Sequence, residues 1–198
     1  MTEILATTVE PTETGTDRYV IDARSSRFTV RAFATGLLSA MGHNPTIAIR
    51  DFTGEIKFNS DKLKAGSLKI IIKPSSLSVQ DDISAKDLRE MERLMNQEVL
   101  ETAKFPEIVY EAPIIFVTKM ADMLYAATLK GNLTLHGVSR SQPINVRVAL
   151  LGSMLRASGD FSLNQTDYDI KPISVAGGAM KLKDELKFSF EIVARRQE

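Results

Sequence analysis

The sequence predicts a mainly β protein, an antiparallel up-and-down barrel of about eight strands with one substantial helix. Three observations lead to this prediction. Apolar and polar residues alternate in many short segments, turn residues separate consecutive segments, and only one long segment has helical spacing. The alternation is clearest from Gly131 to Ile170, which reads as three consecutive strands, each with one apolar and one polar face. Such a sheet curls and closes on itself, because closure removes its exposed edges.

The first part of the chain supplies several strands. Apolar residues alternate with polar ones in segments 19–22, 27–34, 47–49, 52–58 and 67–73, and Pro74 ends the last of these. Residues 36–45 contain two glycines, an asparagine and a proline, which predicts a loop, and residues 59–61 predict a turn.

One segment, residues 84–100, predicts a helix. Leu88, Met91, Leu94 and Met95 recur at helical spacing, and Ser84 followed three residues later by an aspartate is typical of a helix start. Two interpretations of the methionine-rich face are open. It packs on the sheet as ordinary core, or it forms a lid, because methionine adapts to irregular apolar partners.

The strands resume after the helix. Alternation runs through 108–112 and 114–118, with Pro113 breaking or bulging the strand, and then through 125–129 into the segment that begins at Gly131. The final strand, 186–192, has the most regular alternation in the chain.

The apolar faces of these strands predict the wall of the barrel interior. Small residues occur among the large ones, at Ala32, Gly54, Ala127, Gly131, Ala157 and Gly159. Two interpretations stay open: an ordinary filled core, or a hollow barrel with spare room that binds apolar molecules. The predicted lining residues are Phe28, Val30, Ile56, Phe58, Ile70, Ile72, Tyr110, Phe116, Leu129, Leu133, Phe161, Phe188 and Phe190.

Length and composition narrow the class of protein. We expect a flexible tail over residues 1–17 and one domain over 18–198. Lys plus Arg equals Asp plus Glu at 25 each, so charge does not favour nucleic acid as a partner. The chain has no cysteine, no basic and apolar leader and no stretch long enough to cross a bilayer. These features predict a cytoplasmic protein without stable membrane insertion; whether it forms a homodimer stays open.

The residues offer little for catalysis. The two histidines, His43 and His136, are too few for a histidine-rich metal site, and no nucleophile elbow, phosphate loop or dinucleotide fingerprint occurs. His136 falls on the polar phase of its strand, which predicts a solvated side chain. His43 lies in the 36–45 loop, where it is a candidate rim residue beside Met91, Leu94 and Met95. We therefore expect no catalytic residues, no metal and no required cofactor.

The segment from Gly131 to Arg140, GNLTLHGVSR, followed by a valine-rich strand, resembles the G-x-LT-x-x-GV-x-R hallmark of the YceI-like polyisoprenoid-binding proteins. Three further segments resemble the family's blocks and occur in the family's order. The resemblance covers about residues 19–193, nearly everything except the tail. These blocks are RSSRFTVR at 24–31, KFPEIVYE at 104–111, and GDFSLN at 159–164 with Asp167 and Tyr168.

The resemblance implies an extended, lipocalin-like barrel that holds a long isoprenoid chain. Many relatives carry a signal peptide, which this chain lacks, and a subgroup continues the 41–45 loop with a second histidine where this chain has Pro45. The leading hypothesis is a carrier or sequestering protein for a polyisoprenoid or quinone-like lipid. The alternatives are a filled barrel that acts as a stress-response interaction module, and an enzyme that uses His43 for proton transfer on a bound lipid.

Overall fold

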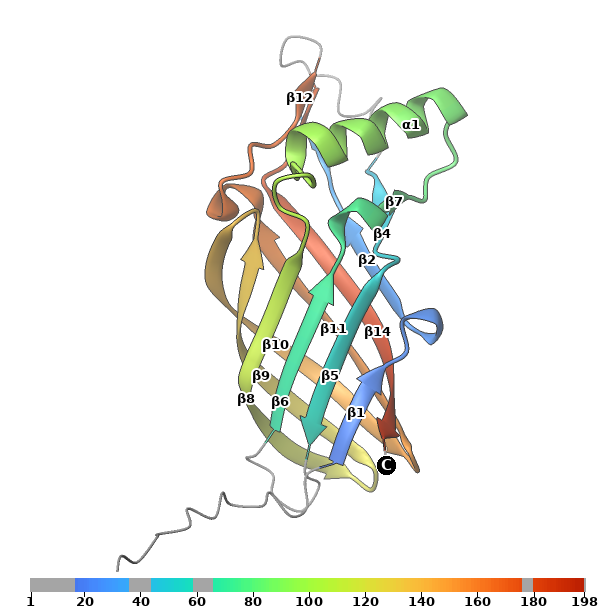
Figure 1. Ribbon diagram of the computed structural model, residues 1–198, viewed down its shortest axis with the longest axis vertical. Helices are drawn as coiled ribbons and strands as arrows, with labels where there is room; N and C mark the ends of the chain where they lie inside the picture. The colour runs from blue at the N-terminus through green and yellow to red at the C-terminus, as the bar shows by residue number, and fades with distance from the viewer. Residues whose placement is uncertain (1–16, 36–43, 59–65, 176–179, 198) are drawn as a thin grey trace, which may run out of the picture.

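Alternating segments form long antiparallel strands, and eight of these close into a barrel (Figure 1). The computed structural model describes residues 17–35, 44–58, 66–175 and 180–197. The fold class predicted from the sequence is confirmed. In their order around the barrel, the strands are β1 (Asp17–Ile21), β5 (Phe52–Phe58), β6 (Gly66–Ile72), β8 (Ile108–Ala121), β9 (Leu124–Leu135), β10 (Val138–Leu151), β11 (Met154–Asn164) and β14 (Glu185–Gln197).

The last strand closes the barrel by pairing with the first. β14 pairs with β1 from Arg18↔Gln197 to Ile21↔Ala194, and its amino-terminal half pairs with β2 (Arg27–Arg31). Between β1 and β2 the chain bends through a short 3-10 turn, η1 (Ala23–Ser25). Two short strands, β4 (Thr46–Ala48) and β7 (Ser78–Val79), extend the sheet beyond β2. A separate small sheet contains β12 (Ser174–Val175), β13 (Met180–Leu182) and β3 (Ala34–Thr35).

The predicted helix is confirmed and lies across one end of the barrel (Figure 1). α1 (Ala85–Leu94) continues into one π-helical turn, η4 (Met95–Val99). The Ser84 hydroxyl accepts a hydrogen bond from the backbone N–H of Asp87 at 3.1 Å, which caps the helix as its sequence indicates. Two further 3-10 turns, η3 (Pro74–Ser76) and η5 (Gln165–Tyr168), connect strands at this end.

A β-bulge at Pro113 reverses the phase of β8, and the expectation that Phe116 lines the interior is therefore wrong. The register with β9 shifts between Glu111 and Ile114, so β8 contains one extra residue. Beyond the bulge, Ile115 and Val117 face the interior, whereas Phe116 is 42% exposed. The ammonium of Lys130 lies 4.8 Å from the centre of the Phe116 ring on the outer surface.

Three glycines of the wall, Gly54, Gly131 and Gly159, are not themselves the source of spare room in the interior. A Cβ atom added to Gly131 would lie 2.6 Å from Cζ of Tyr110, and one added to Gly159 would lie 2.8 Å from Cζ of Phe190. At Gly54 the added atom would meet Ile21 Cδ1 at 2.6 Å. Each glycine is covered by a side chain from a neighbouring strand, so these glycines let rings lie close against the wall.

Some expectations fall on segments beyond the described ranges. Most of the predicted tail and of the 36–45 loop, together with the 59–61 turn, lies outside the described residues. The strand β1 begins at Asp17, the last residue that the sequence assigns to the tail.

We predict that Gly131→Ala destabilises the protein by about 1–3 kcal/mol, because the new methyl group meets the Tyr110 ring and the Glu111 carbonyl. The ring has little freedom to move, since the Tyr110 hydroxyl donates a hydrogen bond to the backbone oxygen of Gln142 at 2.9 Å. The measurement is the free energy of unfolding in denaturant. Asn132→Ala, on the exposed face of the same strand, is the control. Equal stability of the two variants would contradict this account.

Candidate ligand-binding cavity

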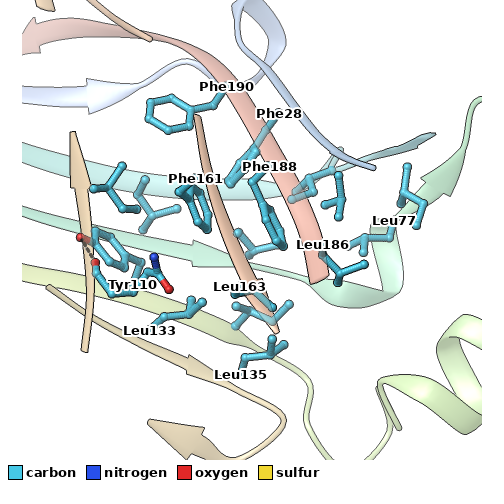
Figure 2. A pocket seen from close by; sticks show the side chains of 18 of the residues that line it. Phe28, Leu77, Tyr110, Leu133, Leu135, Phe161, Leu163, Leu186, Phe188 and Phe190 are labelled. Atoms are coloured by element: carbon cyan, nitrogen blue, oxygen red, sulfur yellow. Dashed lines mark hydrogen bonds between the residues drawn. The ribbon is translucent and has the colours of Figure 1, made fainter. Parts of the chain in front are cut away.

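The interior of the barrel contains a cavity of about 470 Å³ (Figure 2). Every strand of the barrel contributes at least one lining side chain, and α1 and η4 cover one end. This volume lies in the range of protein sites for small organic molecules. The barrel is therefore hollow, and its strands do not enclose a filled core.

All of the predicted lining residues except Phe116 border this cavity. Their function as ligand contacts stays a prediction, because the structure holds no ligand. The residues that do border it are Phe28, Val30, Ile56, Phe58, Ile70, Ile72, Tyr110, Leu129, Leu133, Phe161, Phe188 and Phe190.

Several of these side chains face inward and are still only half-buried. Ile70, Phe161, Phe188 and Phe190 lie on the inward phase of β6, β11 and β14 and border the cavity, yet none of them is fully buried. In a filled core, inward side chains have almost no accessible surface, because neighbouring side chains cover them. The accessible area of these residues is the surface of the cavity.

An aromatic cluster forms one side of the wall, where β2, β11 and β14 are neighbours (Figure 2). The rings of Phe161 and Phe188 are stacked, with centroids 4.6 Å apart and planes 8° apart. Phe28 meets Phe188 and Phe190 edge-on, at 6.4 Å and 5.9 Å. Such contacts fix the rings relative to one another, so this wall keeps its shape without a ligand.

The methionine-rich face of the helix closes one end of the cavity, the position expected of a lid. Met91, Leu94 and Met95 border the cavity together with Leu77 and Val79, which lie before and in β7. The Val79 backbone N–H donates a hydrogen bond to the Glu92 carboxylate at 3.2 Å, which attaches the helix to this strand. The other predicted rim residue, His43, lies outside the described residues.

A few polar side chains also border the cavity, and sequence reasoning missed Gln142, Gln165 and Lys181. Gln142 shares the inward phase of β10 with Ile144, so the alternation contained the signal for it. Gln165 belongs to the 3-10 turn η5, which has no strand periodicity, so the sequence gave no signal that its side chain lines the cavity. Its side chain is 4% exposed, and its amide nitrogen donates a hydrogen bond to the Lys183 carbonyl at 2.9 Å.

Tyr110 brings a polar atom to the apolar wall. Its ring lies over Gly131, and its hydroxyl donates a hydrogen bond to the backbone oxygen of Gln142. Burial raises the pKa of the Tyr110 hydroxyl above its ordinary value of 10.0, because the phenolate would lose its hydration. The side chain is therefore a neutral donor at physiological pH.

The structure corrects the expectation that His136 is solvated. The turn between β9 and β10 places His136 at φ 52° and folds its side chain against the segment that follows the helix. Its side chain is 11% exposed; Nε2 lies 2.9 Å from Glu101 Oε2, and its ring lies 4.3 Å from the Phe105 ring. His136 thus attaches the end of the helical segment to the barrel and does not border the cavity.

The described side chains supply binding surface and little reactive chemistry. Within the described ranges, no three His, Cys, Asp or Glu side chains gather closely enough to hold a metal ion. Among the helices of these same ranges, none is both long and apolar enough to cross a bilayer. The arrangement suits an apolar molecule held by the exclusion of water.

A closed antiparallel barrel around an apolar cavity, with a helix across one end, is the architecture of a lipocalin-like barrel. Comparison of the sequence with protein families matches the YceI-like domain over residues 19–194. The chain belongs to the YceI-like family, as the sequence blocks indicate. A search of the curated proteins finds no match to the sequence.

Three solved structures share the fold at low sequence identity. BcnA of Burkholderia cenocepacia has a TM-score of 0.66 at 16% identity, covering 87% of this chain and 98% of its own. A polyisoprenoid binding domain from Saccharophagus degradans, implicated in plant cell wall breakdown, has a TM-score of 0.66 at 15% identity, covering 90% and 98%. The YceI protein of Campylobacter jejuni has a TM-score of 0.60 at 15% identity, covering 79% and 88%.

We predict that the free energy of unfolding falls above pH 10 and that Tyr110→Phe makes this fall shallower. Above the ordinary pKa of 10.0, the unfolded chain loses the phenol proton while the folded protein keeps it, so a rise in pH favours unfolding. One such group contributes up to about 1.4 kcal/mol per pH unit. The measurement is denaturant unfolding at a series of pH values. At neutral pH the variant should lose only about 1 kcal/mol, the contribution of its hydrogen bond. Parallel pH curves for the two proteins would contradict the buried phenol.

Proposed function

We propose that this protein binds a long apolar lipid, a polyisoprenoid or an isoprenoid quinone-like molecule, inside the barrel and carries or sequesters it. The observation that carries the proposal is the cavity of about 470 Å³ with its almost entirely apolar lining. The structurally similar polyisoprenoid binding domain of S. degradans supports the chemical class of the ligand.

The free energies are consistent with binding that needs no charged anchor. Burial of one CH₂ group yields about 0.8 kcal/mol, so a five-carbon isoprene unit yields roughly 3–4 kcal/mol when fully buried. Association costs about 4–15 kcal/mol in lost freedom. A few buried units therefore offset this cost, and the affinity should depend on chain length and little on salt.

The hollow interior favours this proposal over a filled barrel that acts only as an interaction module. The enzymatic alternative depends on His43, which lies outside the described residues. Binding of an apolar ligand without catalysis is the function that the described side chains support best.

We predict that affinity rises along the series geraniol, farnesol and geranylgeraniol, with Kd falling about tenfold or more for each added isoprene unit. The gain is smaller than full burial would give, because each added unit also loses conformational freedom. The measurement is displacement of a fluorescent apolar probe from the purified protein. Equal affinities along the series would overturn the proposed function.

A matched pair of variants tests whether the apolar chain binds inside the cavity. Ala127 borders the cavity, whereas the next residue back on β9, Ala126, lies on the opposite phase and does not. Ala127→Leu places three extra carbons in the cavity and should weaken geranylgeraniol binding at least about tenfold, because overpacking the site competes with the chain. Ala126→Leu should bind as the natural protein does. Equal weakening by both variants would mean that the chain does not occupy the cavity.

A further inference from the structure

The barrel wall has a seam between β10 and β11. These two strands pair only from Arg147↔Ser158 to Leu151↔Met154, at one end of the barrel. Beyond this short ladder, the remainder of β10 pairs with β9 and the remainder of β11 pairs with β14. Among the described residues, no strand fills the space between them. The two strands are still in contact at Gly159 and Asn145, and beyond that point the ladder between β10 and β11 is incomplete toward the end that α1 covers.

The turn η5 (Gln165–Tyr168) forms a fixed rim at this seam. The backbone N–H of Thr166 donates to Asp184 Oδ1 at 2.8 Å, and its hydroxyl donates to Asp184 Oδ2 at 2.5 Å, which holds η5 against the start of β14. From the other side of the seam, Arg140 of β10 donates from Nε to the backbone oxygen of Asp167. A rim held from both sides keeps its geometry without a ligand.

A polar groove of about 250 Å³ lies on the seam and is continuous with the wall of the cavity. Gln142 and Leu163 border both the groove and the apolar cavity, one from each strand (Leu163 is labelled in Figure 2). Along β10, the same phase runs from Val146 and Ile144 through Gln142 to Arg140. The surface thus changes from apolar to polar along one strand, as the two ends of an amphipathic molecule require.

The charges of the groove select the kind of polar group that it can hold. Arg140 is accompanied by two carboxylates, Asp167 and Glu185, and the hydroxyls and amides of residues such as Ser162 and Asn164 supply uncharged donors and acceptors. The carboxylates disfavour a phosphate or diphosphate, and the guanidinium disfavours a cation. Hydroxyl and carbonyl oxygens find partners there without either penalty.

We propose that this groove is a head-group site, in which an uncharged oxygen group (an alcohol, phenol or quinone oxygen) lies while its apolar chain passes between Gln142 and Leu163 into the cavity. This inference rests on the proposed function and adds where the polar end of the ligand lies and which chemistry it has. It also makes the seam the place where the head group reaches solvent.

The first test compares three probes of similar chain length: geranylgeraniol, geranylgeranyl diphosphate and the hydrocarbon phytane. The alcohol should bind about tenfold more tightly than the diphosphate, because two carboxylates face the anion. The double variant Asp167→Asn, Glu185→Gln should bring the two affinities close together. Glu191→Gln removes a carboxylate that pairs with Arg27 on the outer wall, and this control should leave the difference unchanged.

The second test locates the head group. The natural chain contains no cysteine, so Ser162→Cys introduces a single thiol in the groove. Bound geranylgeraniol should slow the reaction of this thiol with a cysteine-directed reagent about fivefold or more, since reaction requires access to the thiolate. Ser153→Cys, in the turn at the opposite end of the β10–β11 pair, is exposed and should react at the same rate with and without the alcohol.

The outcomes of these tests distinguish the head-group site from the proposed function of the cavity. If all three probes bind equally and Ser162→Cys is not protected, while Ala127→Leu still weakens binding, the head-group site is wrong and the cavity function stands. If none of the three probes binds to the natural protein, the proposed function fails and the head-group site fails with it. Preference for the alcohol together with protection of Ser162→Cys supports both.

Discussion

The pairing of β14 with β1 is the interaction on which the rest of this structure depends. It converts a row of hairpins into a closed wall, and closure gives every strand an inner face that water reaches only through the cavity. A closed sheet of eight strands has an interior of limited width, which side chains can fill or leave open. In this protein the sheet is extended and the helix meets it only at one end, so the middle stays hollow.

The hollow depends on how the aromatic side chains are arranged, and small residues alone do not explain it. Rings from one strand lie over glycines of the next, as Tyr110 does over Gly131 and Phe190 over Gly159. A ring held against the wall contributes apolar surface without crossing the interior. The same arrangement lets the Tyr110 hydroxyl donate a hydrogen bond to the backbone oxygen of Gln142, a residue that borders both the cavity and the polar groove. Wall, cavity and polar groove therefore share residues.

The sequence predicted the features that depend on local periodicity. The strands and twelve of the thirteen predicted lining residues follow from alternation, because an inner face of period two is required wherever a sheet closes around an apolar interior. The helix with its Ser84 cap follows from helical spacing. Phe116 was misplaced because a one-residue bulge reverses every later side chain; Pro113 indicated a break or bulge, but not that the inward phase would change there. The burial of His136 and the seam at Gln142 arise from contacts between distant segments, which no local pattern contains.

We propose that the cavity of this barrel holds an apolar chain. The most direct test is mass spectrometry of an organic extract from the protein purified out of its native host, compared with an unrelated protein prepared in the same way. We expect an isoprenoid-chain lipid in near-stoichiometric amount, with an uncharged oxygen head group. An extract in which the only molecules enriched over the control are polar would contradict it, whereas a phosphorylated isoprenoid would contradict only the uncharged head-group site.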